Sequence, residues 1–135
     1  MQKEKVRLGE LLGIYQVLTF LAQSQLPVKT AYWLNRVLKG VNKEFQELEE
    51  ARKKLIEKYV SRDERGEPKL NEAKTEYEFE PEKRVEFEKE FAELGKEEIE
   101  IDIYKFNLDQ FGDLKIAPAM MPVLERFIAD AVPEV

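Results

Sequence analysis

The sequence predicts one α+β domain over residues 1–135, in which a long N-terminal helical hairpin packs with a small two- or three-stranded sheet and two shorter helices. Two long segments with apolar residues at alternating spacings of three and four predict the hairpin. Short segments in which apolar and acidic residues alternate predict the strands. A chain of this length has the size of a single domain and can bury a substantial core.

The helical hairpin is expected over residues 1–60. Its first helix, over residues 8–25, has apolar side chains around most of its circumference, which indicates a largely buried helix. A second helix over residues 28–60 follows Pro27, because proline suits the first turn of a helix and disfavours helical geometry in the residue before it. At 1.5 Å per residue this second helix is about 50 Å long, so the shorter first helix cannot cover all of it.

The second helix carries the most regular pattern in the chain, a heptad stripe of apolar residues that runs from Ala31 to Tyr59 and is interrupted once, by Arg52. The distal half of the stripe must pack on later parts of the chain or on another chain, because the first helix is too short to reach it. This uncovered part indicates a surface for a protein partner. Its candidate partner-binding residues are Phe45, Leu48, Arg52, Leu55 and Tyr59.

Residues 75–106 predict a strand–helix–strand unit. Aromatic and acidic residues alternate over residues 75–80, and isoleucine and acidic residues alternate over residues 97–106, so both segments are expected to be strands. A helix over residues 82–94 lies between them. Its length allows either a parallel crossover or an antiparallel pair capped by the helix.

The two remaining segments are less regular. Residues 61–74 are polar and contain Gly66 and Pro68, which predicts an exposed loop. Residues 107–135 are expected to form a turn and then a helix that begins near Pro118 and continues to about residue 130.

Acidic residues are concentrated in residues 67–102, which carry fourteen acidic and six basic side chains, for a net charge of −8 within a total of −6. On the second strand, Glu98, Glu100 and Asp102 share one face. That face has three interpretations: the polar side of a half-buried sheet, a surface for a protein partner, or a carboxylate site for Mg²⁺ or Ca²⁺. Mimicry of a nucleic-acid phosphate row is a further alternative, which the six interspersed basic residues weaken.

Tyr32 and Trp33 lie beside the heptad stripe of the second helix. Tryptophan and tyrosine are enriched among the residues that dominate protein–protein binding. The alternative is that Trp33 packs against the first helix, because it lies where the two helices overlap.

Composition excludes several kinds of chemistry. The chain has no cysteine and no histidine, which excludes disulfides, thiolate zinc sites, cysteine nucleophiles and Ser–His pairs. It has no phosphate-binding glycine motif, so no cofactor is expected and the chain is not expected to be an enzyme. The net negative charge disfavours binding to nucleic acid or to an anionic membrane. The absence of a long apolar segment or a signal-peptide cleavage pattern predicts a cytoplasmic protein.

The order of segments resembles an uncharacterised family of small proteins encoded by tailed bacteriophages and prophages. The resemblance covers nearly the whole chain and is carried by the segments LPVKTAYWLNRVLK, FQELEEARKKLIEKYV, RDERGEPK, EFEKEFAELGKEEIEIDIYKF and LKIAPAMMPVLERFI. It rests on overall pattern and implies no catalytic residues. It does imply a bacteriophage protein that is made in the cytoplasm of a bacterial host.

Together these observations predict a non-catalytic, phage-type protein-binding factor that inhibits or modulates a host or defence protein. The partner is a host or phage protein. The first alternative is a virion or assembly component that associates with itself through the heptad stripe. The second is a metal-dependent enzyme built on Glu98, Glu100 and Asp102.

Overall fold

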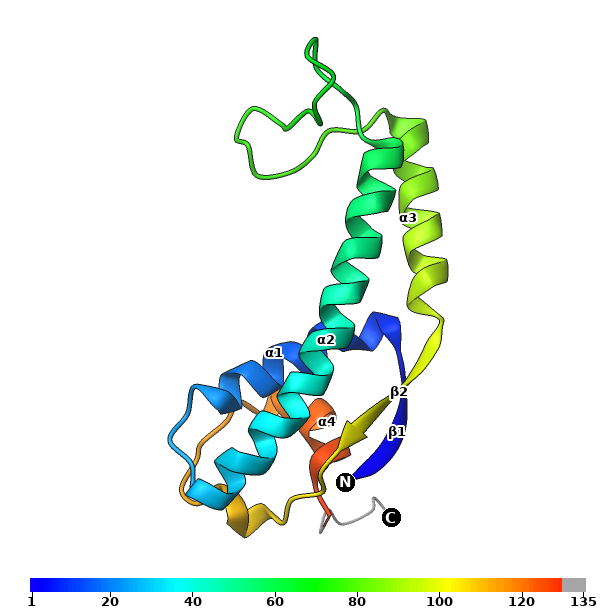
Figure 1. The fold of residues 1–135 in the computed structure, drawn as a ribbon. Helices are drawn as coiled ribbons and strands as arrows, with labels where there is room; N and C mark the ends of the chain where they lie inside the picture. The colour runs from blue at the N-terminus through cyan, green and yellow to red at the C-terminus, as the bar shows by residue number, and fades with distance from the viewer. Residues whose placement is uncertain (130–135) are drawn as a thin grey trace.

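A computed structural model describes residues 1–129 and shows a base from which two helices project together as an arm (Figure 1). The strands are β1 (Gln2–Arg7) and β2 (Glu98–Ile103), and the α-helices are α1 (Leu11–Ala22), α2 (Val28–Tyr59), α3 (Pro81–Gly95) and α4 (Met121–Leu124). We define the arm as residues 49–95 and the base as residues 1–48 and 96–129. The predicted α+β fold class is confirmed, with a two-stranded sheet.

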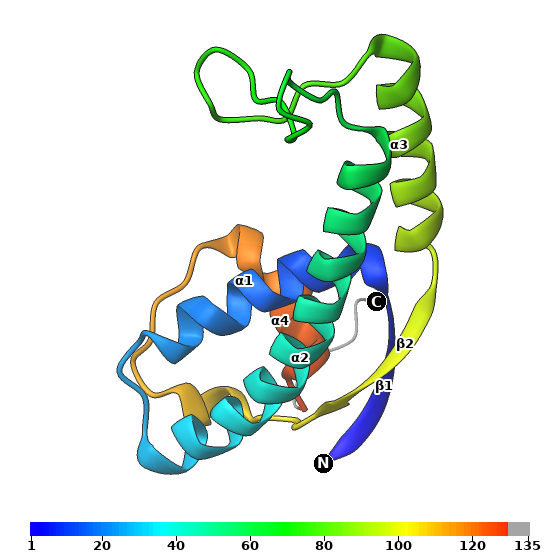
Figure 2. The ribbon, with the colours of Figure 1, turned by 45° about the horizontal axis from the view of Figure 1, so that its top comes forward.

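The core of the protein lies in the base. There α1 packs against the first half of α2, and the sheet and α4 complete the enclosure (Figures 1 and 2). Six of its largest fully buried side chains are Leu11, Ile14, Leu18, Leu34, Phe106 and Phe127. Burial of each such side chain contributes about 1.5–3 kcal/mol of hydrophobic stabilisation.

The partner of β2 differs from the prediction. Residues 75–80 do not form a strand, so the predicted strand–helix–strand unit is wrong. The partner is β1, at the N-terminus, which pairs with β2 in antiparallel register from Gln2 opposite Ile103 to Arg7 opposite Glu98. The physical reason is charge, because residues 75–80 would place glutamates opposite the acidic face of β2, and like charges directly opposite one another destabilise a sheet.

The helical segments lie close to their predicted positions. The first helix starts as a 3₁₀ turn at Leu8–Glu10 and continues as α1, and α2 is continuous for 32 residues. The helix between the loop and β2 is α3, with Pro81 in its first turn, where the missing N–H of proline costs no helical hydrogen bond. Among the described residues, no helix is both long and apolar enough to cross a membrane.

The loop at the tip of the arm extends from residue 60 to residue 80, beyond the predicted 61–74. It is mostly exposed, and isolated bridges, one of which joins Leu70 to Tyr77, organise it together with hydrogen bonds within the loop. Gly66 takes a positive φ of 79° in a turn where its N–H donates to the carbonyl oxygen of Asp63, a conformation that glycine adopts without the steric cost of a Cβ.

The C-terminal helix expected from Pro118 is replaced by three short pieces. A 3₁₀ turn at Pro118–Met120, the single turn of α4 and a second 3₁₀ turn at Glu125–Phe127 follow one another. Pro122 supplies no N–H to continue a helical ladder, and the chain then becomes extended at Ile128, where it bridges to Phe106. The predicted end of this helix, at residue 130, lies outside the described residues.

Candidate functional site

The candidate residues on α2 do not form one exposed stripe. Leu48 and Tyr59 are each only 8% exposed, because other parts of the same chain cover them. Phe45 is half-buried and its ring stacks on Tyr15 of α1, with centroids 4.4 Å apart. Arg52 is exposed and lies 3.7 Å from Glu49.

The distal part of α2 is covered by α3 of the same chain (Figure 1). The prediction left open whether a later element or another chain packs here, and in this structure it is the later element. The two helices leave cavities on both sides of their contact. The candidate residues of α2 are divided between these cavities.

The first cavity lies at the elbow between base and arm and has a volume of about 370 Å³. We call it the elbow cavity, and six of the residues that line it are Leu8, Leu12, Phe45, Leu48, Arg52 and Phe91. Five of these six are apolar. Leu12 is 50% exposed, so part of this apolar surface is open to solvent.

The elbow is a close crossing of two backbones. Gly9, in the 3₁₀ turn after β1, faces Gly95, the last residue of α3, and both line the elbow cavity. A Cβ added to Gly9 would lie 3.2 Å from the carbonyl oxygen of Gly95. The lack of a side chain at position 9 therefore allows the arm to leave the base at this angle.

A second cavity, of about 380 Å³, lies farther along the same side of the arm and shares Arg52 with the elbow cavity. We call it the tip cavity. Its aromatic wall continues along α3, where the ring centroids of Phe79 and Phe87 are 5.1 Å apart and those of Phe87 and Phe91 are 6.1 Å apart. The guanidinium of Arg84 lies 6.0 Å from the centroid of Phe79. This side of the arm is thus an aromatic surface bordered by arginines.

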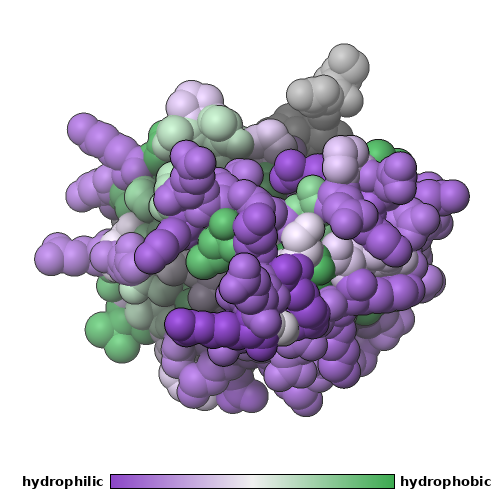
Figure 3. All heavy atoms as spheres, turned by 90° about the horizontal axis from the view of Figure 1, so that it is seen from above, coloured by the Kyte–Doolittle hydropathy of each residue, from purple (hydrophilic) through white to green (hydrophobic). Residues whose placement is uncertain are grey.

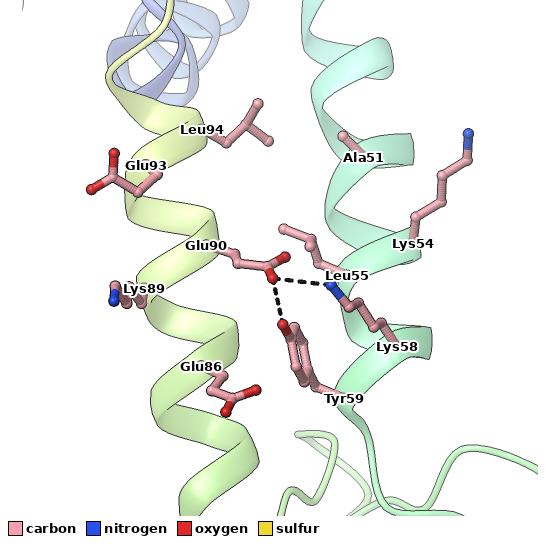
Figure 4. A pocket seen from close by; sticks show the side chains of 10 residues that line it. All are labelled: Ala51, Lys54, Leu55, Lys58, Tyr59, Glu86, Lys89, Glu90, Glu93 and Leu94. Atoms are coloured by element: carbon pink, nitrogen blue, oxygen red, sulfur yellow. Dashed lines mark hydrogen bonds and ion pairs between the residues drawn. The ribbon is translucent and has the colours of Figure 1, made fainter.

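The third cavity, of about 740 Å³, shares no lining residue with the other two and lies on the other side of the α2–α3 contact (Figure 4). We call it the arm groove. Its α2 wall includes Lys54, Leu55 and Lys58, and its α3 wall includes Glu86 and Glu93. The groove therefore has only basic charges along α2, whereas its α3 wall is acidic overall, with Lys89 among three glutamates.

One hydrogen-bonded cluster crosses the arm groove (Figure 4). Lys58 Nζ donates to Glu90 Oε1 at 3.0 Å, and the hydroxyl of Tyr59 donates to the same oxygen. The hydrogen bond from Tyr59, followed by that from Lys58, lowers the pKa of Glu90 below its usual value. The hydrogen bond to Glu90 in turn raises the pKa of both Tyr59 and Lys58. A carboxylate held ionised beside a phenol held protonated is a weak base beside a weak acid, which favours a structural role for the cluster.

The acidic face of β2 is neutralised by its neighbouring strand. In the observed register, Glu98 lies opposite Arg7, Glu100 lies opposite Lys5, and Asp102 lies opposite Lys3. Lys3 Nζ and Asp102 Oδ1 are 3.2 Å apart. These are the opposite-charge cross-strand pairs that stabilise sheets.

The structure also tests the metal site that was one interpretation of Glu98, Glu100 and Asp102. Within residues 1–129, no group of three or more acidic side chains is arranged to hold a metal ion. Residues 1–7 fall within the range 1–60 that was predicted as a helical hairpin, but they contain the strand β1, and their basic residues at positions 3, 5 and 7 have the spacing of a strand face. That spacing is the signal that matches them to β2.

Trp33 is partly buried and packs against the core of the base. Its ring stacks on Tyr104, with centroids 4.9 Å apart and planes 10° apart. Tyr32 meets Trp33 edge to face and is 53% exposed. Tyr104, the residue that follows β2, thus holds the pair of Tyr32 and Trp33 on the outside of the base.

Comparisons with protein-family models, with curated proteins and with solved structures give no match to this chain. The resemblance to a bacteriophage family therefore stays a prediction, and the functional argument rests on the cavities and charges described above.

Proposed function

We propose that this chain is a non-catalytic protein-binding factor of a tailed bacteriophage, which inhibits or modulates a host or defence protein in the bacterial cytoplasm. In this proposal an apolar side chain of the partner enters the elbow cavity. The observation that carries the proposal is an open apolar cavity at the junction of the base and a projecting arm. A partner bound there touches both parts of the molecule.

The composition of the elbow cavity supports a protein ligand. Leu12, Phe45 and Phe91 supply an apolar centre, and the pair formed by Arg52 and Glu49 supplies a charged rim. Protein interfaces have this anatomy, with an apolar centre surrounded by polar groups. The volume lies at the lower end of the range of about 300–1,000 Å³ that is typical of ligand pockets.

The surface around the tip of the arm has a different character. Seen down the arm, hydrophilic side chains cover most of the surface, and hydrophobic ones show only as small separate patches (Figure 3). Exposed apolar side chains of the arm such as Leu70, Tyr77 and Val85 are scattered, whereas several apolar side chains meet in the elbow cavity, which favours that cavity as the place of contact.

Photo-crosslinking from position 12 tests the proposal. A benzophenone amino acid at Leu12 is expected to link the chain to one host or phage protein in a bacterial lysate. The matched position is Val85 on α3, which is 65% exposed but does not line the elbow cavity. Pull-down with a tagged chain that lacks the crosslinker then compares the variants: we expect the same partner to be captured by the unaltered chain and by Val85→Glu, and its recovery to fall at least about tenfold with Leu12→Glu. Equal capture by both folded variants would contradict the proposal.

A second candidate function, a self-associating virion or assembly component, is favoured by the charges of the arm groove. A two-fold axis along the arm would place α2 of one copy against α3 of the other. Lys54 and Lys58 would then face Glu86 and Glu93 of the second copy, in the arrangement of a four-helix bundle.

Light scattering separates this candidate from the first. Self-association predicts a dimer that Lys54→Glu dissociates, whereas Lys53→Glu, a neighbouring exposed lysine outside the groove, leaves it intact. A monomer at high concentration, together with absence of the chain from purified particles, counts against the second candidate.

A further inference from the structure

The outer face of the first half of α2 carries only basic charge. Its residues follow one another at steps of three, four, three and four, so they share one side of the helix. They are Lys29, Tyr32, Arg36, Lys39 and Lys43, and all five are exposed. We call this set the basic face. No acidic residue occurs between Glu10 and Glu44, so neither α1 nor the first half of α2 offers these cations a carboxylate.

The cations of the basic face are unpaired. Among residues 1–129, no carboxylate lies within ion-pair distance of any of its four basic side chains. Elsewhere in the protein, cations such as Lys3, Lys58 and Lys96 do have acidic partners. The positive charge of the basic face is therefore not neutralised within the described chain.

The centre of the basic face is preorganised by aromatic contacts. The guanidinium of Arg36 lies 5.9 Å from the ring centroid of Tyr32 and 5.7 Å from that of Trp33, and its Nη1 donates to the hydroxyl of Tyr32 at 3.1 Å. Trp33 is held in turn by its stack on Tyr104. A side chain already ordered in the free protein loses less conformational entropy when a ligand binds.

We propose that the basic face binds an acidic segment of a protein. Charge complementarity identifies the chemistry of the ligand, since four unpaired cations over about 21 Å of helix match carboxylates on successive turns of a partner helix. Exposed tyrosine beside arginine and tryptophan is the composition of protein-binding hot spots.

A nucleic acid fits the basic face less well. The chain carries a net charge of −6, with −8 in residues 67–102. That field repels an extended polyanion, whereas a short acidic segment meets the basic face alone. The basic face lies on the base and shares no residue with the lining of the elbow cavity. The proposal for the basic face can therefore be tested independently of the proposed function.

A fluorescein-labelled helical peptide with four glutamates at spacings of three and four tests the proposal. The control peptide carries glutamine at the same positions. We expect saturable binding of the glutamate peptide only, weakened about tenfold by the double variant Arg36→Glu/Lys39→Glu. The variant Lys53→Glu/Lys83→Glu makes the same change in net charge at exposed positions elsewhere, and it should change affinity less than about twofold.

A third variant tests the aromatic part of the basic face. Tyr32→Ala removes a half-exposed ring, so the fold should be retained, and circular dichroism checks this. We expect about threefold to fivefold weaker binding of the glutamate peptide, because the support of Arg36 is lost.

Three results would overturn the proposal. The first is an equal loss of binding in the two charge-reversed double variants, which would show nonspecific attraction. The second is tighter binding of a single-stranded oligonucleotide of equal charge than of the peptide, which would make the basic face a nucleic-acid site. The third is a dimer in light scattering that Arg36→Glu/Lys39→Glu dissociates, which would make a second copy the occupant.

Discussion

The base and the arm share one helix, α2, but they are held together in different ways. In the base, Phe106 and Phe127 are each 1% exposed within a continuous apolar core. In the arm, none of the fifteen residues of α3 is buried to a comparable degree. On the α2 side of the arm Ile56 and Tyr59 are buried, α3 contributes half-buried aromatic rings, and hydrogen bonds join Lys58 and Tyr59 to Glu90.

This difference indicates that the core that stabilises the protein and the apolar surface that is open to a partner lie in different regions. A region with few buried apolar contacts opens at a lower free energy than the core does, so we expect α3 to separate from α2 without unfolding of the base. The apolar surface that the arm leaves incompletely covered is the same surface that forms the elbow cavity and the tip cavity.

The largest expected effect is on the free energy of unfolding, when one phenylalanine of the base and one of the arm are each replaced by alanine. Phe106→Ala removes a fully buried ring from the base and should lower the free energy of unfolding by about 3–5 kcal/mol. Phe87→Ala removes a half-buried ring from the arm and should cost about 1–2 kcal/mol, because less apolar area is lost from contact. Urea denaturation measures both free energies. Equal costs would show that base and arm form one cooperative core, against the separation argued above.

The junction between the two regions is tested by two glycines. Gly9→Ala places a Cβ 3.2 Å from the carbonyl oxygen of Gly95, and it should destabilise the protein by about 1–3 kcal/mol because the backbone must shift. Gly40→Ala is the control, since nothing lies within 4 Å of a Cβ there, and it should stabilise α2 by about 1 kcal/mol. Thermal unfolding measures both changes. If Gly9→Ala is neutral, the close crossing at the elbow does not constrain the arm.

A smaller effect is expected from pH, and it should be confined to the arm. The pKa of Glu90 is lowered in the folded protein from its reference value of 4.5. The stabilisation it provides is therefore complete above pH 4.5 and is lost as the pH falls through the lowered pKa. The pKa of Tyr59 is raised from 10.0, so its contribution is complete below pH 10 and is lost as the pH rises through the raised pKa.

Amide hydrogen exchange in α3 measures this pH dependence. We expect the protection of the α3 amides, which is the intrinsic exchange rate at each pH divided by the observed rate, to fall at both extremes, with little change at the core of the base. Glu90→Gln should abolish the acid part of the effect, and Glu93→Gln, at a neighbouring glutamate that pairs with the exposed Lys96, should keep it. An unchanged acid response in Glu90→Gln would show that other carboxylates control the contact.

The smallest expected effect concerns the sheet of the base. Lys5→Glu places two glutamates opposite one another at the Lys5–Glu100 pair and should cost about 0.2–1 kcal/mol, because cross-strand charge pairs contribute that amount. The double variant Lys5→Glu/Glu100→Lys should recover most of the loss. A double-mutant cycle measured by urea denaturation gives the coupling, and zero coupling would mean that charge does not select the strand partner.

Much of the fold was predictable because the signals for it are local. The stripe of α2 and the alternation of β2 each depend on residues a few positions apart, and both elements occur close to their predicted ends. Pro27 and Pro81 mark helix starts through their own covalent geometry. The C-terminal helix was predicted too long because its apolar spacing resembled a helix, whereas Ile128 is extended and pairs with Phe106.

The candidate site was predictable only in part. Phe45, Leu48 and Arg52 do line one cavity, and Leu55 and Tyr59 line another. Their separation depends on where α3 contacts α2, which periodicity within α2 does not specify. For the acidic residues of β2 the sequence left three interpretations open, the polar face of a sheet, a partner surface and a metal site, because the basic strand that faces them lies at the other end of the sequence.

The sequence by itself determined the helices α1, α2 and α3, the strand β2, the lack of thiol and imidazole chemistry, and the positive charge of the first half of α2. These follow from residue type and short-range spacing. The tertiary structure decided which strand β2 pairs with, which side of α2 is covered and where the cavities lie. Those outcomes depend on contacts between distant residues, such as the pair Lys3–Asp102, 99 positions apart. Local propensity does not specify such contacts, and packing and charge complementarity select them.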